Sequence, residues 1–217
     1  TNYIKRGMDR ARKMDAQALI IELDTPGGLL KSTKNIVQAM LDADDLPIVV
    51  YVSPEGASAA SAGTFITMAA HVATMAPTTN IGAASPVQMS PGGGSGQTDT
   101  VMQKKIFNYS ESYIETIANR RGRNAEWAIS AVRDGESITA EEAVEINVID
   151  FIAENREDLL TQLDGRVAAG DTLRTSGATI TEIPTNMAES VLGFLIRPEV
   201  MLILTMIAIY GIIGEVT

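Results

Sequence analysis

Short apolar runs alternate with helical segments through the first half of the chain, and this alternation constrains the fold more than any other feature. Residues 18–23 and 48–52 have the apolar, β-branched character of buried parallel strands. Helical patterns at residues 3–16, about 30–42 and about 61–71 separate or flank these runs. Because successive parallel strands need a crossover connection, usually a helix, the order predicts an α/β domain with a largely parallel sheet.

The second half of the chain predicts more helices and smaller additions. Thr139 and Glu142 have the spacing of a capping box, which starts a short helix. Residues 90–96 are all glycine, serine or proline, which predicts a mobile loop. We expect this loop to cover part of a functional site. The other expected elements are helices at about residues 101–121, 125–133 and 156–163, strands at 72–75, 81–84 and 148–153, and a small β addition at 171–183.

Composition and charge exclude several classes of function. The chain has 217 residues, no cysteine and a formal net charge of −10. Without cysteine there is no disulfide scaffold, thiol nucleophile or cysteine-ligated zinc site. The acidic balance argues against a nucleic-acid partner, which requires a basic face. His71 is the single histidine, so multi-histidine metal sites are excluded too, and we expect neither a metal nor a cofactor.

The C-terminal run of residues 200–213 carries no charge and is apolar on every side. A surface helix of a soluble domain shows one apolar stripe instead. The run therefore predicts the truncated start of a membrane region, although it is shorter than the roughly 20 residues that span a bilayer. A buried core helix is the alternative. Residues 188–196 are amphipathic and lead into the run, so we expect one domain at 1–186 and a membrane-related segment at 187–217.

Gly27 and Gly28 follow Pro26 at the end of the first predicted strand. Adjacent glycines let backbone amides approach a ligand because no Cβ obstructs them. Ligands of open α/β sheets bind at the carboxyl ends of strands, so this loop is a candidate binding loop, with an ordinary strand-to-helix turn as the alternative. A nucleotide loop is disfavoured, since neither GxGxxG nor GxxxxGK[ST] occurs.

Small residues at positions 56–63 lead into a predicted helix and make Ser58 and Ser61 candidate nucleophiles. The amides and the dipole of a helix N-terminus stabilise an oxyanion, and small neighbours leave space for a substrate backbone. Either serine can instead be an ordinary N-cap. His71 is unsuited as the base for Ser61, because a helix joining them would separate them by about 15 Å.

Lys104 and Lys105 occur in the predicted helix after the glycine-rich loop. If Met102, Ile106, Tyr109 and Tyr113 form the apolar stripe of that helix, Lys105 lies at the border of the stripe and Lys104 faces solvent. Desolvation by an apolar wall favours a neutral lysine, which can accept a serine proton. The alternative is a lysine whose stem packs while its ammonium stays in water.

Taken in order along nearly the whole chain, these features resemble the NfeD-type membrane-bound serine proteases, relatives of Clp protease and signal peptide peptidase A. The matching stretches are residues 23–28, 56–64, 75–77, 81–83, 105–109, 122–124, 139–149 and the apolar C-terminal start. The resemblance implies a ClpP/crotonase-like α/β fold of repeated ββα and βαβ turns. One difference is that the first strand of the family, which usually precedes the amphipathic helix, is missing from this sequence.

The resemblance also implies a Ser-Lys dyad. By the matching motifs, Ser61 is the nucleophile, Lys105 is the base, and the oxyanion hole comes from the amides of Gly28, with Gly27 adjacent, and of Ala62. Clp protease itself uses a histidine base, but Ala84 occupies the corresponding position here.

The function implied by the resemblance is a membrane-anchored serine endopeptidase. Its expected substrates are polypeptides, in particular apolar segments of membrane proteins such as stomatin-like (SPFH) partners. A homodimer or larger homo-oligomer is expected, attached to the membrane through the C-terminal segment, with the protease domain on the extracytoplasmic side. The alternative is a non-catalytic ClpP-like scaffold that binds and organises membrane-protein partners. Acyl-CoA chemistry of the crotonase type is disfavoured, because no basic cluster suits the CoA phosphates.

Overall fold

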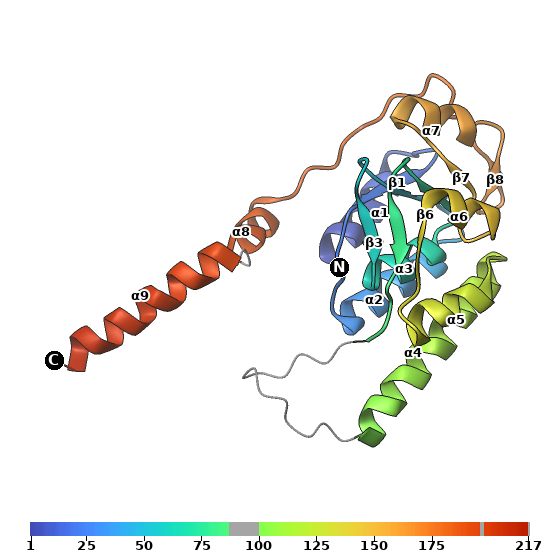
Figure 1. Ribbon diagram of the computed structural model, residues 1–217. Coiled ribbons are helices and arrows are strands. Elements are labelled where there is room, and N and C mark those ends of the chain that lie inside the picture. Colours follow the sequence, from blue (N-terminus) through green and yellow to red (C-terminus); the bar gives the residue numbers. More distant parts are fainter. Residues whose placement is uncertain (87–99, 196–197, 217) are drawn as a thin grey trace. The chain divides into compact units, whose positions relative to one another are not determined.

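The structure is a computed structural model that describes residues 1–86, 100–195 and 198–216 (Figure 1). The predicted loop at residues 90–96 lies outside the described residues. The chain forms two compact units, Thr1–Thr179 and Ile180–Thr217. The first unit contains both larger sheets and the candidate site residues.

A parallel four-stranded sheet forms the centre of the first unit, in the order β1 (Leu19–Leu23), β2 (Ile48–Val52), β4 (Val72–Met75) and β7 (Phe151–Ile152). All its neighbouring pairs are parallel. Every residue of β2 is buried, which explains its unbroken apolar sequence, since a strand covered on both faces has no polar side. The predicted α/β organisation with a largely parallel sheet is confirmed.

A second, smaller sheet has the order β3 (Ser58–Ala60), β5 (Asn80–Gly82) and β6 (Ser137–Thr139). Strand β3 pairs with β5 in parallel, and β5 pairs with β6 antiparallel. Neither β3 nor β6 was among the strands expected from the sequence. The sequence of β3, Ser-Ala-Ala, has little intrinsic β preference, so its hydrogen bonds to distant β5 determine its conformation.

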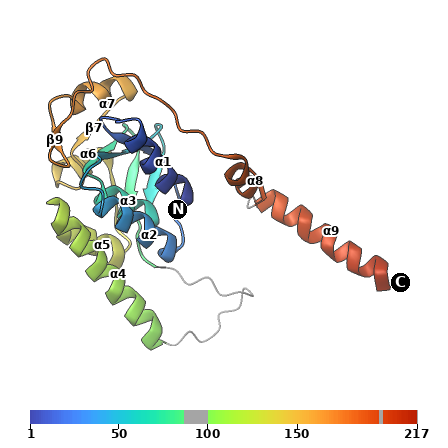
Figure 2. The same cartoon turned by 180° about the vertical axis from the view of Figure 1, so that it is seen from behind.

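The helices of the first unit lie close to their predicted positions. They are α1 (Asn2–Lys13), α2 (Leu30–Leu41), α3 (Ala62–Ala69), α4 (Thr100–Arg121), α5 (Ala125–Arg133), α6 (Ala140–Glu145) and α7 (Arg156–Leu163). Helix α3 packs against both α2 and α4, and α4 packs against α5. Figures 1 and 2 show α4 and α5 at one end of this unit and α7 at the other.

The apolar stripe predicted for α4 is only partly correct. Met102 is 53% exposed and Tyr109 is 42% exposed. The fully buried positions of α4 are Ser110, Ile114, Ile117 and Ala118, which lie towards its C-terminal half. The contacts with α3 and α5 therefore select the buried face, and the first turns of α4 remain exposed.

The predicted β addition at residues 171–183 is smaller than expected. The structure forms a two-stranded hairpin of β8 (Val167–Ala168) and β9 (Asp171–Thr172), and residues 173–183 form no strand. The hairpin is anchored by Ala168 and Leu173, which belong to an apolar cluster with β2, β4, β7 and α7. The predicted strand at residues 148–153 likewise shortens to β7.

The second unit contains α8 (Met187–Leu195) and α9 (Pro198–Val216). The described side chains of both helices are mostly exposed and include many large apolar residues. Within the described residues, no single helix is both long and apolar enough to span a membrane. Residues Met187–Leu195 and Glu199–Tyr210, bent by 70°, meet that requirement only as a pair and only by length and composition.

Candidate active site

Ser61 lies at the junction of β3 and α3 in an unusual backbone conformation, with φ 50° and ψ −108°. A positive φ is costly for a residue with a Cβ, and such strain concentrates at functional sites. The backbone is held by the hydrogen bond from the Ser61 amide to the carbonyl of Gly82, at 3.0 Å. Although Ser61 is the N-cap residue of α3, its side chain makes no capping hydrogen bond. Its hydroxyl is therefore available for other chemistry.

The loop after β1 lies directly beside Ser61. Thr25 forms an isolated parallel bridge with Ala59: its amide donates to the carbonyl of Ser58 at 2.7 Å, and its carbonyl accepts from the amide of Ala60 at 3.0 Å. Gly27 follows with φ +148°, a conformation that side chains rarely adopt. These backbone hydrogen bonds place the glycine pair against the start of α3. The pair follows the carboxyl end of β1, and ligands of open α/β sheets bind at such strand ends.

Two backbone amides of this junction are candidates for an oxyanion hole. The first turn of a helix leaves its amides without intrahelical partners, and Ala62 is the first residue of α3. Gly28 is adjacent, since a Cβ on it would lie 3.3 Å from the Ala62 Cβ. Among the turn, loop and capping bonds of the described residues, none uses the amide of Gly28 or of Ala62. The amide of Gly27 instead donates to Thr25 Oγ1 at 3.1 Å.

A solvent-open cavity of about 80 Å³ begins at these groups. Its walls come from the loop after β1, from α2, α3 and α4, and from the segment after β5. The lining residues are Gly28, Leu30, Thr33, Ser61, Ala62, Phe65, Ala84, Pro86 and Ser110. The nucleophile candidate and both amide-bearing residues thus share one small, mostly apolar cavity.

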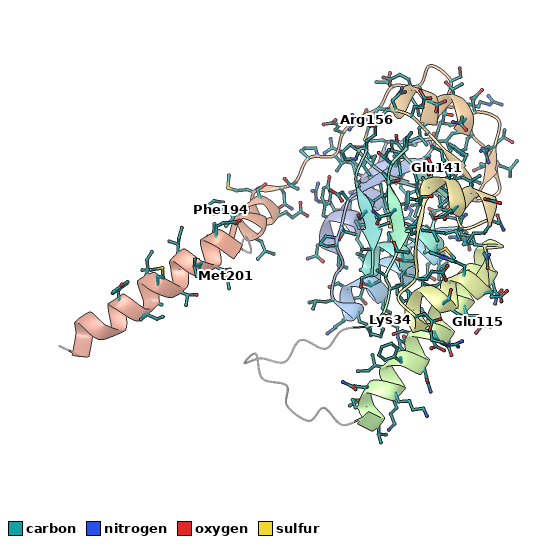
Figure 3. All side chains as sticks on the ribbon, viewed as in Figure 1. Lys34, Glu115, Glu141, Arg156, Phe194 and Met201 are labelled. Carbon is teal, nitrogen blue, oxygen red and sulfur yellow. The ribbon has the colours of Figure 1, made fainter. Side chains whose placement is uncertain are left out.

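Aromatic rings support the α3–α4 side of the cavity. Phe65 stacks on Tyr113 with ring centroids 6.0 Å apart, and Tyr113 stacks on Tyr109 at 5.8 Å. Burial, with a smaller contribution from Tyr109, raises the pKa of Tyr113 to about 12, so this phenol is neutral at physiological pH. The Nζ of Lys34, which reaches from α2 towards α4 (Figure 3), lies 5.3 Å from the centroid of the Tyr109 ring.

Lys105 lies near the start of α4, where its side chain is exposed, as is that of Lys104. It is not among the residues that line the cavity, whereas Ser110 of the same helix is. The structure therefore brings Gly27, Gly28, Ser61 and Ala62 together and places Lys105 outside the cavity lining. Lys105 belongs to the exposed first turns of α4. It therefore lacks the apolar surroundings that were expected from the predicted stripe.

His71 has a structural position away from Ser61. It follows α3, and its Nδ1 accepts a hydrogen bond from the Ile48 amide at 3.1 Å, while its own amide donates to the Ile48 carbonyl at 2.9 Å. Burial, followed by the positive charge of Arg121, lowers the pKa of His71 to about 4. The imidazole is thus a neutral partner for the first residue of β2, in agreement with its predicted place at a helix end.

Sequence reasoning did not single out Ser110, which lines the cavity, or Gly82, which holds the Ser61 backbone. Ser110 was not singled out, because it lies at the border of the stripe predicted for its helix, on the side opposite Lys105. Gly82 was part of a matching stretch, but its role was not apparent. Its carbonyl accepts both from the Ser61 amide and from Thr64 Oγ1, at 3.0 and 2.8 Å.

Comparison with known proteins identifies relatives along the whole chain. A family model described as the N-terminal domain of NfeD1b matches residues 1–171. The chain is 33% identical over 225 residues to the membrane-bound protease PH1510 of Pyrococcus horikoshii, covering 98% of this chain and 50% of that protein. It is 25% identical over 227 residues to the membrane protein NfeD1b of Bacillus subtilis, covering 99% of this chain and 47% of that protein. The chain thus spans about half the length of these curated relatives.

Solved structures of a protease called 1510-N share the fold. One, described as a membrane-bound stomatin-specific protease with a lysine replaced by alanine and a substrate peptide bound, has a TM-score of 0.80 and 33% identity, covering 89% of this chain and 90% of that one. Another, with a serine replaced by alanine, has a TM-score of 0.74 and 35% identity, covering 85% and 91%. These matches confirm the predicted α/β fold, which the chain shares with the 1510-N protease. The chain belongs to the family of the NfeD1b N-terminal domain.

Proposed function

We propose that this chain carries a serine endopeptidase site in which Ser61 is the nucleophile. The observation that carries the proposal is the junction of β3 and α3: a strained serine makes no capping bond there and adjoins two available amides and a cavity. An ordinary N-cap serine would use its hydroxyl to bond the first turn. The relatives named as membrane-bound proteases support peptide hydrolysis as the reaction.

In the proposed reaction, the Oγ of Ser61 attacks the carbonyl carbon of a peptide bond while its proton passes to a neutral lysine. The amides of Gly28 and Ala62 then donate to the developing oxyanion. Collapse of the tetrahedral intermediate breaks the C–N bond, and the lysine returns its proton to the leaving amine. A water molecule hydrolyses the resulting ester of Ser61 by the same steps, which restores the free hydroxyl.

We propose Lys105 as the base, on the strength of its place in the family motif. The solved relatives include one variant with a lysine replaced and one with a serine replaced, which supports a site built from these two residue types. Lys105 lies on the helix that contributes Ser110 to the cavity wall. In the active state, this assignment requires the first turns of α4 to bring the Lys105 ammonium to Ser61.

Gly27 has a different proposed role from Gly28. Its amide already donates to Thr25 Oγ1, and its carbonyl accepts from the same hydroxyl at 2.9 Å. We therefore propose that Gly27 shapes the loop and leaves room for Ser61, while Gly28 and Ala62 donate to the oxyanion.

Labelling by a serine-directed fluorophosphonate tests the nucleophile. The reagent should modify Ser61, as identified by mapping the labelled peptide, and Ser61→Ala should abolish both labelling and peptide hydrolysis. Ser58→Ala is the matched control, because Ser58 is a serine of the same segment but lies within β3. Labelling of Ser58, or unchanged hydrolysis by Ser61→Ala, would contradict the proposal and favour a scaffold function.

For substrate and location, we propose stomatin-like membrane proteins as targets and membrane attachment through residues 187–217, with residues 1–186 as the protease domain on the extracytoplasmic side. The description of 1510-N as stomatin-specific supports the substrate class, and the exposed apolar side chains of α8 and α9 support the attachment. Deleting residues 187–217 should abolish flotation with lipid vesicles. Light scattering on the purified chain tests the expected dimer or larger assembly.

A further inference from the structure

Thr64 is a buried residue of α3, three positions after Ser61. It is 0% exposed, and its hydroxyl connects the start of α3 to the smaller sheet. Thr64 Oγ1 lies 2.8 Å from the carbonyl oxygen of Gly82 on β5 and 3.0 Å from that of Ala59 on β3. A threonine hydroxyl has one proton, so these two carbonyls share it. The side chain thus joins α3 to both strands.

This use of the hydroxyl is unusual for a helical threonine. Threonine in a helix commonly bonds the carbonyl four residues earlier, as Thr33 Oγ1 of α2 does with the Leu29 carbonyl at 3.1 Å. The carbonyl four residues before Thr64 belongs to Ala60, and the non-helical backbone of Ser61 separates the two. Because Thr64 bonds carbonyls of two strands instead, its hydroxyl stabilises the junction rather than the helix.

Ser61 and Thr64 form a closed ring of hydrogen bonds with Gly82. The Ser61 amide donates to the Gly82 carbonyl at 3.0 Å, and the Thr64 hydroxyl donates to the same oxygen. The Thr64 amide completes the ring, since it donates to the Ser61 carbonyl at 3.1 Å. The backbone of Ser61 is therefore held on both sides, by Gly82 directly and by Gly82 through Thr64.

Gly82 is a fixed point for this ring. It pairs with Ser137 of β6, and the next amide, of Ala83, donates to the carbonyl of Glu136 at 2.7 Å. A Cβ on Gly82 would clash with that same carbonyl oxygen, so the two segments are in close contact. Because β6 holds Gly82 in place, the hydrogen bonds from Ser61 and Thr64 determine where the start of α3 lies.

The direction of the Ser61 side chain depends on this ring. Its φ of 50° is costly for a residue with a Cβ, and such a conformation persists only where the surrounding structure enforces it. The side chain makes no capping hydrogen bond of its own, so the backbone decides the direction of its Cα–Cβ bond. A shift of the ring would move Ser61 Oγ relative to the amides of Gly28 and Ala62.

We infer that Thr64 is a positioning residue for the nucleophile. Its hydroxyl holds the start of α3 on Gly82 and so keeps Ser61 Oγ in place for attack. This inference rests on the proposed peptidase function. Thr64 is not among the residues that line the cavity, so it acts through Ser61 and not by contact with a substrate. Its loss should therefore slow the attack and leave substrate binding unchanged, because misplacing a reacting group by up to 1 Å costs about 10²-fold in rate.

Thr64→Val tests the inference, because valine has nearly the shape of threonine but no hydroxyl. Its kcat should be roughly 10- to 100-fold lower, with an unchanged KM. The rate of Ser61 labelling by a fluorophosphonate should fall by a similar factor, since this reagent reports on the serine without a peptide substrate. Thr64→Ser keeps the hydroxyl and should retain most of both rates.

Two other buried threonines are matched controls. Thr67 lies one turn further along α3, and its Oγ1 has no hydrogen-bond partner among the described residues. Thr74 on β4 donates to the Val50 carbonyl at 3.2 Å, so Thr74→Val removes a buried hydrogen bond within the larger sheet. Both Thr67→Val and Thr74→Val should keep the wild-type kcat and labelling rate, and the Tm of each variant measures the effect on folding alone.

A folded Thr64→Val with the wild-type kcat and labelling rate would overturn the inference while leaving the peptidase intact. Equal losses in Thr64→Val and Thr74→Val would also overturn it, since general destabilisation would then explain both. If Thr64→Val does not fold, Thr64→Ser and Thr64→Cys decide, because a thiol is a weak donor: equal labelling in the two would overturn the inference. If the wild-type chain cleaves no peptide and Ser61 takes no fluorophosphonate, the proposed function fails, and the inference fails with it.

Discussion

A Cβ atom on Gly27 would lie 3.1 Å from the Cβ and 3.4 Å from the Oγ of Ser61. The glycine loop and the nucleophile candidate come from different crossovers of the sheet, yet they lie so close that a side chain at residue 27 would crowd Ser61. The position of the Ser61 side chain therefore depends on the absence of a side chain at residue 27.

We expect Gly27→Ala to reduce peptide turnover by roughly 10²-fold, because displacing a reacting group by a fraction of an ångström to 1 Å has effects of that size. The added methyl meets Ser61 at a distance tighter than ordinary contact, and the φ of +148° is unfavourable for alanine. Steady-state kinetics on a peptide substrate gives the measurement.

Gly177→Ala is the control for this substitution. Gly177 also has a positive φ, of +71°, but a Cβ there meets nothing within 4 Å. Both variants carry backbone strain, and only Gly27→Ala disturbs Ser61. Equal activity in the two variants would show that residue 27 does not position the nucleophile.

The two neighbouring lysines of α4 should respond differently to substitution. Lys105→Ala is expected to abolish peptide cleavage, whereas Lys104→Ala should be mild, because only Lys105 occupies the position of the proposed base. The measurement is the kcat/KM of both variants on a peptide substrate. Activity retained in Lys105→Ala would exclude this lysine as the base.

Gly82→Ala should destabilise the fold rather than only the site. A Cβ on Gly82 would lie 2.1 Å from the carbonyl oxygen of Glu136, a backbone atom that no side-chain movement can clear, and φ is +136°. We expect a loss of about 3 kcal/mol or more in the free energy of unfolding, measured by urea denaturation.

The matched substitution is Gly122→Ala, with φ +68° and nothing within 4 Å of the added Cβ. It carries the cost of a left-handed backbone, about 1 to 2 kcal/mol, without the clash. A loss in Gly82→Ala no larger than that in Gly122→Ala would contradict the close packing of β5 on residue 136.

His71 should make the folded chain less stable in mild acid. Its pKa is about 4 in the folded state, through burial and then Arg121, and about 6.5 when unfolded. Between these values the unfolded chain binds more protons, so stability is complete above pH 6.5 and falls as pH drops towards 4. Because the imidazole is only partly buried, we expect His71 to contribute roughly 1 to 2 kcal/mol to this loss.

His71→Gln removes the titrating group and should flatten the stability profile between pH 6.5 and 4, as measured by chemical denaturation at a series of pH values. The same variant should retain peptide hydrolysis at neutral pH, since His71 contacts Ile48 rather than Ser61. If the free energy of unfolding of the variant depends on pH as steeply as that of the wild type, His71 is not the source of the acid sensitivity. Loss of hydrolysis in a folded variant would refute the Ser-Lys proposal.

Local signals in the sequence were sufficient for the helices and the central strands. The apolar run of β2 and the helical patterns of α2 and α5 each depend on residues close in sequence, so they could be predicted directly. The capping box also formed as expected: the Glu142 amide donates to Thr139 Oγ1 at 3.3 Å, and the Thr139 amide donates to Glu142 Oε2 at 2.9 Å.

The sequence by itself also determined which residue types meet at the candidate site, through the glycine pair after the first strand and the serine before a helix. Tertiary structure alone decided that Ser61 has a positive φ, because its amide is held by Gly82 from another strand. It also decided that Ser110 is part of the cavity wall and that Lys105 is not. Which face of α4 is buried depends on its packing against α3 and α5. The free energy of this packing comes from apolar surface buried between different segments of the chain. No local sequence pattern therefore specifies the buried face.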